Sequence, residues 1–295
     1  MECRAIAEGR APWADALPRT PLRTKHSGLS TFNLSHMNAI RGFLLDLDGV
    51  VWFGERLAPG AGEFIEQCAT MGLPIVFVTN ASAMSRANLL SKFHRLGLTQ
   101  VTTAQIFSAS RVLGEYIAAR KANARVLVLG EQGTIDELVL AGVQSVQEQA
   151  DFVAISADKS ITYDKLTRIC REALNGAEIV AANQDRHFPH EDGVLPGAGA
   201  FMAFVEYCSK KTATVVGKPS PAIFEQAIQA LGYMPHELMM IGDTPEVDIL
   251  GARAVGLRTT LIGVHVLADL PLEMQPDLHA RDLAHAWQLI SHFQT

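Results

Sequence analysis

Two aspartates stand directly after the first apolar run of this sequence, at a spacing suited to chemistry. Asp46 and Asp48 follow the run Phe43-Leu44-Leu45, and Gly49 comes next. Residues i and i+2 of a strand point to the same face, so the two carboxylates converge if the strand continues. If the chain bends at Gly49, their side chains and carbonyls surround one point instead. Either arrangement concentrates negative charge, although an Asp-Gly pair is also typical of a solvated turn.

A hydroxyl and an amide follow a second apolar run. Thr79 and Asn80 come after Val76-Phe77-Val78, and Ser82 stands shortly before a predicted helix. Such groups, together with the N-terminus of the helix, bind phosphate oxygens well. The structural alternative is that Ser82 or Asn80 caps the helix.

Two further clusters carry charge at predicted strand ends. Lys218 stands between Gly217 and Pro219, and this rigid setting is less typical of a free surface lysine. Asp243 and Asp248 lie at a later junction between a strand and a helix. Asp248 also suits the positive end of its helix, whereas Asp243 has no such structural explanation.

The hydrophobic periodicity predicts the elements that must position these side chains. Strands are expected over residues 41–47, 74–79, 125–130, 151–156, 178–182, 213–217, 237–242 and 258–263. Helices are expected over residues 62–71, 85–96, 108–121, 132–141, 162–174, 198–209, 220–231, 247–255 and 282–293. Strands that are apolar on both faces are typical of a parallel sheet covered by helices on both sides. The predicted fold class is therefore α/β, with function expected beyond the carboxyl ends of the strands.

Composition excludes several classes of protein. The 295 residues include 25 Lys+Arg and 31 Asp+Glu, which gives a net charge of -6. This balance argues against a general nucleic-acid binder, because such proteins need basic groups to neutralise phosphates. No apolar run reaches the ~18 residues of a membrane span, so we expect a soluble protein. The cysteines form no C-x-x-C pair, which indicates reduced thiols in a cytoplasmic protein; an exported protein with disulfides is the alternative.

The first 37 residues differ from the rest of the chain. They contain prolines and basic residues, but no apolar stretch of signal-peptide length. A disordered tail is one interpretation. A transit peptide is another, although Glu2, Glu8 and Asp15 do not fit its acid-poor pattern. An overextended start is the third, because Met37 stands just before the first predicted strand.

Taken in order, the four clusters resemble the motifs of the haloacid dehalogenase superfamily of aspartate-nucleophile phosphatases: D-x-D-G, Thr-Asn, Gly-Lys-Pro and G-D-x-x-x-x-D. Thr79 follows Asp46 by 33 residues and Asp243 follows Lys218 by 25, whereas 139 separate Thr79 from Lys218. An insertion there is similar to the cap of the class IIA branch, which includes p-nitrophenyl, phosphoglycolate and pyridoxal phosphate phosphatases. The resemblance implies a Rossmann-like core of residues 38–121 and 213–295. It also implies an inserted α/β cap of residues 122–212 that sets substrate specificity.

The resemblance assigns roles to the charged residues. Asp46 would be the nucleophile that forms an aspartyl-phosphate. Asp48 would protonate the leaving oxygen and later deprotonate the water. Lys218 would offset the charge of the nucleophile and the phosphate. Asp46, the carbonyl of Asp48 and Asp243 would bind Mg²⁺, with Asp248 in support.

The resemblance also places the substrate contacts. Phosphoryl oxygens would be held by residues that follow the first two strands: Gly49, Thr79, Asn80 and Ala81. Ala81 departs from a second Asn found in many class IIA members, which puts substrate identity in doubt more than chemistry. In the cap, a polar loop would recognise the leaving group through Asn183, Asp185 and His187. His187 and His190 lack the third partner that a metal site needs, so we do not expect them to bind metal.

The predicted function is Mg²⁺-dependent hydrolysis of small phosphorylated metabolites, such as phosphoglycolate, sugar phosphates, nucleotides or pyridoxal phosphate. We expect no nucleic-acid or membrane partner. The sequence does not decide whether the protein forms a homodimer through the cap. The alternatives are a phosphomutase and a non-catalytic member of the same fold that binds phospho-ligands or proteins. The presence of Asp46 counts against the non-catalytic alternative. Release of free phosphate would exclude a mutase.

Overall fold

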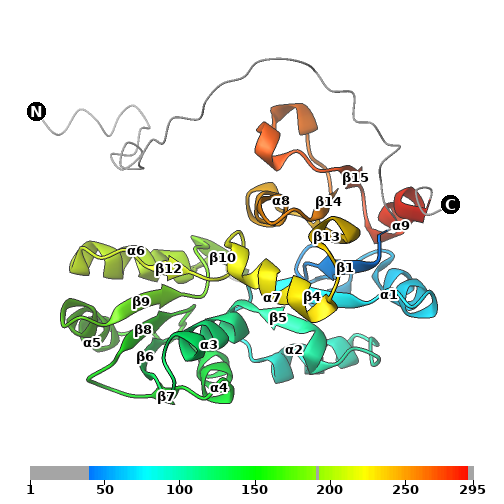
Figure 1. The fold of residues 1–295 in the computed structure, drawn as a ribbon. Helices are drawn as coiled ribbons and strands as arrows, with labels where there is room; N and C mark the ends of the chain where they lie inside the picture. Colours follow the sequence, from blue (N-terminus) through cyan, green and yellow to red (C-terminus); the bar gives the residue numbers. More distant parts are fainter. Residues whose placement is uncertain (1–39, 191–192, 292–295) are drawn as a thin grey trace, which may run out of the picture. The chain divides into compact units, whose positions relative to one another are not determined.

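The computed structural model describes residues 40–190 and 193–291, which form two parallel β-sheets flanked by helices and two short antiparallel hairpins (Figure 1). The predicted α/β class is confirmed. The tail predicted for residues 1–37 lies outside the described residues. In the described part of the chain, no helix is long and apolar enough to cross a membrane.

The first sheet has six strands, and all its neighbouring strands are parallel. From edge to edge they are β15 (Leu278–Ala280), β14 (Arg258–Ile262), β13 (Leu238–Gly242), β1 (Gly42–Leu45), β4 (Ile75–Thr79) and β5 (Ile106–Ser108). The chain runs from β1 to β4 and β5 on one side, and places β13 on the other. The carboxyl ends of β1, β4 and β13 therefore meet where the strand order reverses, which is the usual ligand site of such sheets.

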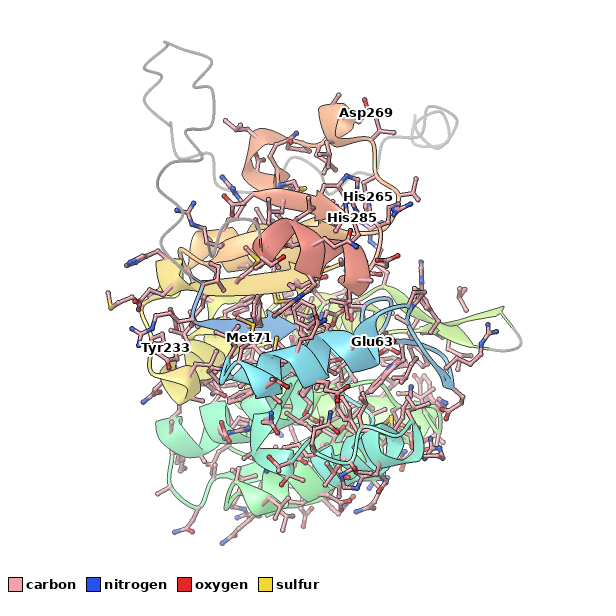
Figure 2. The ribbon with its side chains drawn as sticks, turned by 90° about the vertical axis from the view of Figure 1, so that its right-hand side faces the viewer. Glu63, Met71, Tyr233, His265, Asp269 and His285 are labelled. Atoms are coloured by element: carbon pink, nitrogen blue, oxygen red, sulfur yellow. The ribbon has the colours of Figure 1, made fainter. Side chains whose placement is uncertain are left out.

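Helices cover both faces of this sheet because the strand side chains alternate between two apolar cores. Phe43 and Leu45 of β1 pack in one core, and Leu44 packs in the other. The helices of the first face are α1 (Ala61–Thr70), α2 (Arg86–Arg95) and α9 (Leu283–Ser291). The helices of the second face are α3 (Ala109–Arg120), α7 (Pro221–Leu231) and α8 (Leu250–Ala254). Figure 2 shows α1, between Glu63 and Met71, beside α9, which carries His285.

The second sheet has five parallel strands. In spatial order they are β12 (Thr214–Val215), β9 (Glu178–Ala181), β8 (Phe152–Ile155), β6 (Arg125–Leu129) and β7 (Gln144–Ser145). Helices α4 (Gln132–Leu140), α5 (Tyr163–Leu174) and α6 (Ala198–Ser209) pack on it. The apolar core that contains Leu44 continues to Val126 and Phe152 of this sheet, so one buried core joins the two sheets.

One predicted strand pairs with a different sheet from the one expected. Residues 213–217 were predicted as part of the first sheet, but β12 pairs with Val180 and Ala181 of β9. The pairing continues past β12, since the N–H groups of Val216 and Gly217 donate to the carbonyls of Ala181 and Ala182. Lys218 therefore follows an edge strand of the second sheet, and the first sheet resumes only after this residue.

Several short elements were not predicted. The hairpins are β2 (Trp52–Phe53) with β3 (Arg56–Leu57), and β10 (His187–His190) with β11 (Gly193–Pro196). Single turns of 3-10 helix span Thr103–Gln105, Pro235–Glu237, Leu267–Asp269 and Leu272–Met274. The helix predicted over residues 247–255 instead begins as a π-helical turn, Pro245–Ile249, and continues as α8.

Candidate active site

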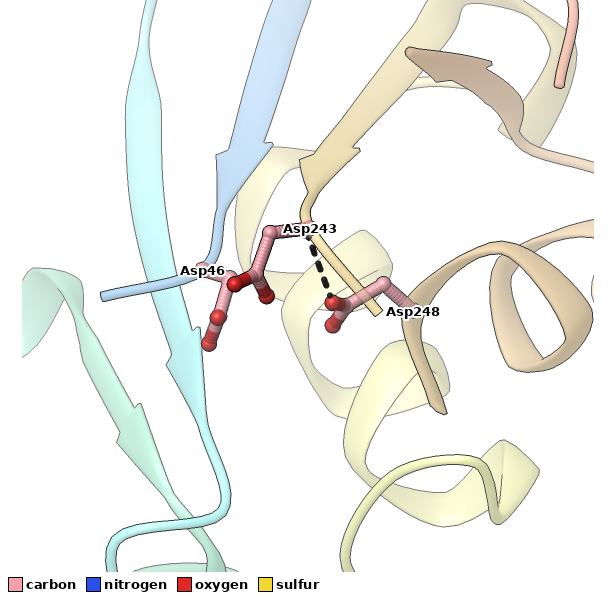
Figure 3. A group of neighbouring side chains, drawn as sticks. All are labelled: Asp46, Asp243 and Asp248. Atoms are coloured by element: carbon pink, nitrogen blue, oxygen red, sulfur yellow. Dashed lines mark hydrogen bonds between the residues drawn. The ribbon is translucent and has the colours of Figure 1, made fainter. Parts of the chain in front are cut away.

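Three carboxylates converge beyond the carboxyl ends of neighbouring strands. Asp46 follows β1, Asp243 follows β13, and Asp248 lies on the turn before α8 (Figure 3). Each offers an oxygen, and these oxygens lie within 4.8 Å of one another. Carboxylate oxygens are the ligands that Mg²⁺ and Ca²⁺ prefer, so the chemistry of this set fits a hard divalent cation.

A buried lysine lies against two of these carboxylates. The Nζ of Lys218 donates to Oδ1 of Asp46 at 2.6 Å and to Oδ1 of Asp248 at 2.7 Å, and the residue is 1% exposed. Burial alone would lower the pKa of Lys218, but the charges of Asp248 and Asp46 raise it above its ordinary value. The lysine is therefore a permanent cation in the site.

One cation does not neutralise three carboxylates. Burial raises the pKa of Asp46 well above its ordinary value; Lys218 opposes this effect, while Asp248 and Asp243 add to it. Burial also raises the pKa of Asp243, and the charge of Asp248 contributes. Ionising these buried carboxylates therefore costs free energy, and a bound divalent cation would lower that cost.

The loop after β13 closes around Asp248. The Oδ2 of Asp248 accepts from the N–H groups of Asp243 at 3.2 Å and Thr244 at 3.0 Å, while its Oδ1 accepts from Lys218. The Thr244 hydroxyl donates to Oδ1 of Asp243 at 3.1 Å. With both of its oxygens engaged, Asp248 orients Lys218 and the loop, which fits the supporting place predicted for it.

Gly49 permits Asp243 to approach the end of β1. Its φ is +88°, which is in the left-handed region, and a Cβ at this position would collide with the Asp243 carboxylate. A side chain here would be strained and would also displace the carboxylate. Gly49 of the Asp-Gly pair therefore packs against the carboxylate cluster.

The residues after β4 lie beside the lysine. The amide nitrogen of Asn80 donates to the carbonyl of Lys218 at 3.0 Å, and its Oδ1 is buried with no hydrogen-bond partner among the described residues. The Thr79 hydroxyl is buried and accepts from the N–H of Ala81 at 3.0 Å. The methyl group of Ala81 packs against the core of the first face. Asn80 is thus joined directly to Lys218, whereas the Thr79 hydroxyl holds the backbone that follows β4.

The carboxylate of Asp48 lies outside this cluster. Its side chain is exposed, and its Oδ1 accepts from the indole N–H of Trp52 at 2.9 Å. Sequence reasoning did not identify Trp52 because an aromatic residue in an apolar run gives no sign of a polar partner.

The predicted cap residues occupy different environments. Asn183 is 3% exposed, and its amide donates to the carbonyl of Asn80 at 2.7 Å. Asp185 is half-buried and accepts from the Asn80 amide at 3.1 Å; burial raises its pKa, and this hydrogen bond opposes the rise. His187 is exposed at the start of β10. Asn183 therefore holds the backbone after β4, whereas His187 is the residue with access to solvent.

Residues 80–86 are also bound by residues of α4 and by the residue after β8, which the sequence did not reveal. The carbonyl of Ser82 accepts from the hydroxyls of Thr134 at 2.6 Å and Ser156 at 3.1 Å. Glu137, which is 1% exposed, accepts from the backbone N–H and the Nε of Arg86, both at 2.7 Å. An acid on a predicted helix is usually solvated, so Glu137 gave no signal in sequence.

Two family descriptions match the chain, one over its first part and one over its last part. Residues 43–144 match the haloacid dehalogenase-like hydrolases, and residues 215–286 match a family described as HAD-hydrolase-like. The first match contains Asp46 and Thr79, and the second contains Lys218, Asp243 and Asp248.

Characterised proteins are similar along most of the chain. The sugar-phosphatase AraL of Bacillus subtilis is 40% identical over 224 residues, which cover 75% of this chain and 82% of that protein. Chronophin of Rattus norvegicus is 35% identical over 243 residues, covering 78% and 79% respectively. The solved structure of a p-nitrophenyl phosphatase from Archaeoglobus fulgidus superposes with a TM-score of 0.79 at 30% identity, covering 85% of this chain and all of that one.

Proposed function

Because the chain belongs to the haloacid dehalogenase-like hydrolases, as its motifs predicted, we propose that it is a Mg²⁺-dependent phosphatase of small phosphorylated metabolites that acts through an aspartyl-phosphate on Asp46. The observation that carries this proposal is the position of Asp46, buried against Lys218 within a cluster of carboxylates. Relatives named sugar phosphatase, 5'-nucleotidase and p-nitrophenyl phosphatase support the reaction type.

Asp46 has the surroundings of a nucleophile. The ammonium group of Lys218 at 2.6 Å favours the ionised form of its carboxylate, against the effect of burial, and fixes its orientation. In the first step, a carboxylate oxygen of Asp46 bonds to phosphorus as the bond to the leaving oxygen breaks, and Asp48 gives that oxygen a proton. In the second step, Asp48 takes a proton from water, the water oxygen bonds to phosphorus, and Asp46 is released.

The cation would be held by Asp46, the carbonyl of Asp48 and Asp243, with Asp248 orienting the loop beside them. When bound, Mg²⁺ supplies positive charge that offsets the repulsion between these carboxylates and a phosphate dianion. Lys218 supplies the protein's own share of that charge.

Phosphoryl oxygens would be held by groups at the ends of β1 and β4: the amides near Gly49, the hydroxyl of Thr79, and the residues Asn80 and Ala81. The second sheet with its helices would act as the cap over these strand ends; the predicted cap, residues 122–212, contains every strand of this sheet except β12. Among its polar residues, Asp185 and His187 would contact the leaving group. Small metabolites rather than phosphoproteins would be substrates, because a cap restricts access to the strand ends.

The test is release of inorganic phosphate from a panel of sugar phosphates, nucleoside monophosphates, phosphoglycolate and pyridoxal phosphate, with p-nitrophenyl phosphate as the reporter. Asp46→Asn is the matched control, because it keeps the shape of the side chain and removes the nucleophile. Phosphate release by the unmodified protein and none by the variant supports the proposal. Rearranged phosphoesters without free phosphate would indicate a mutase, and inactivity towards every substrate would indicate a binding protein.

A further inference from the structure

Asp48 has a single side-chain partner in residues 40–190 and 193–291. The indole N–H of Trp52 donates to its Oδ1 at 2.9 Å. An indole nitrogen is only a donor, so this contact has a fixed direction. The other carboxylate oxygen, Oδ2, has no such bond within the described chain.

The indole is held rigidly on several sides. Trp52 is 1% exposed, and its ring meets Phe93 edge to face, with ring centroids 4.8 Å apart. The Nζ of Lys92 lies 4.3 Å from the centroid of the indole ring. A cation at this distance is attracted to the π-electrons and draws electron density towards itself, which makes the indole N–H a better donor.

The backbone fixes the same pair. The carbonyl of Leu47 accepts from the N–H groups of Val51 at 2.8 Å and Trp52 at 3.1 Å, and the N–H of Gly49 donates to the carbonyl of Trp52 at 2.8 Å. Residues 48 and 52 thus sit across a closed turn, with their backbone and their side chains both joined. An exposed aspartate would otherwise sample several rotamers.

We propose that Trp52 is a positioning residue for proton transfer by Asp48; this inference rests on the phosphatase mechanism proposed above. In a protonated carboxyl group, the carbonyl-type oxygen is the better acceptor, so the indole selects Oδ1 for that role and places the proton on Oδ2. The Oδ2–H proton passes to the leaving oxygen as its bond to phosphorus breaks. The carboxylate that results then receives the proton of the hydrolytic water on the same oxygen.

The experiment measures kcat/KM for substrates with leaving groups of different basicity, from p-nitrophenyl phosphate to glycerol phosphate, in the Mg²⁺-loaded protein. Nitrophenolate leaves without a proton, whereas an alkoxide needs one. Trp52→Phe keeps an aromatic ring against Phe93 and removes the N–H donor together with part of the buried ring. We expect it to lower kcat/KM for glycerol phosphate by roughly tenfold, a fraction of the ~10² to 10⁴ that acid–base catalysis contributes, and to change p-nitrophenyl phosphate hydrolysis far less.

Two controls separate positioning from packing. Phe93→Leu loosens the same aromatic contact without removing the donor, and should affect both substrates equally. Asp48→Asn sets the upper limit of the leaving-group effect. If Trp52→Phe lowers both substrates by the same factor, or changes neither, the inference is wrong.

A second pair of variants applies if Trp52→Phe does not fold. Lys92→Met removes the cation beside the indole, and Lys92→Arg keeps it. Lys92→Met should lower kcat/KM for glycerol phosphate selectively, by less than the roughly tenfold loss expected for Trp52→Phe. Lys92→Arg should not. Identical behaviour of the two variants would contradict the proposal. Failure of the proposed function has a different signature, because the unmodified protein would then release no phosphate from either substrate.

Discussion

Replacement of Lys218 by methionine should destabilise the metal-free protein far more than loss of an ordinary ion pair. Methionine has a similar length but no charge, so Asp46 and Asp248 would lose their shared cation while remaining buried. Removing one member of a buried ion pair typically costs ~3–5 kcal/mol, because the remaining charge is left uncompensated. We therefore expect the free energy of unfolding to fall by about that amount near neutral pH.

The assay is urea unfolding of the unmodified protein and the variant in EDTA, followed by circular dichroism. Lys121→Met is the matched control, because Lys121 pairs with Asp151 at 2.7 Å but is half-exposed, at 53%. Exposed pairs contribute ~0–1 kcal/mol, so this control should be close to the unmodified protein. Equal effects of the two substitutions would refute the argument that Lys218 compensates buried charge.

Three further outcomes follow from the site. In excess EDTA, hydrolysis of p-nitrophenyl phosphate should fall to background, since the carboxylates then repel the substrate; undiminished turnover would contradict the metal site. The rise in melting temperature on adding Mg²⁺ should be larger at pH 8 than at pH 5. Burial raises the folded-state pKa of Asp46 and Asp243 above the ordinary value of 3.8. Between 3.8 and the raised values, the metal-free folded protein therefore binds more protons than the unfolded chain. Its stability falls as the pH rises through this range. A constant metal effect across this range would count against the pKa shifts. Finally, Asn183→Ala should slow hydrolysis of all substrates, because its amide holds the carbonyl of Asn80, whereas His187→Ala should raise KM several-fold for the best metabolite only, as expected for loss of one hydrogen bond. If Asn183→Ala impaired hydrolysis of the best metabolite substrate only, Asn183 would instead contact the leaving group.

The parts of the site that follow apolar strands could be predicted from the sequence. Asp46 and Asp243 come directly after strands whose side chains are buried on both faces, and Thr79 is the last residue of such a strand. Such strands are recognisable by composition, and their carboxyl ends meet in a parallel sheet. The apolar composition of the strands therefore predicts where these residues lie in the folded protein.

The pairing of Lys218 and the burial of Glu137 could not be predicted in the same way. The strand before Lys218 reads like any apolar strand, and its place beside β9 depends on tertiary contacts with residues 180 and 181. Glu137 lies on a helix whose pattern allows a solvated acid, and the packing of α4 against α2 and α3 buries it. Neither fact depends on local sequence, so periodicity gives no information about them.

The strand order of the first sheet has a consequence for how the protein is made. β1 is synthesised long before one of its two neighbours, β13, which pairs Leu238 with Gly42. Until β13 is synthesised, β1 has an unpaired apolar edge, and such edges favour aggregation. A nascent chain would carry this exposed edge until residues 46–237 had been synthesised.

The same strand order means that the candidate active site is completed late in synthesis. Lys218 is 172 positions from Asp46, and Asp243 comes later still. An N-terminal fragment, even one with the whole second sheet, holds Asp46 without its cation or its carboxylate neighbours. We therefore expect chains that end before Asp243 to lack the proposed phosphatase activity.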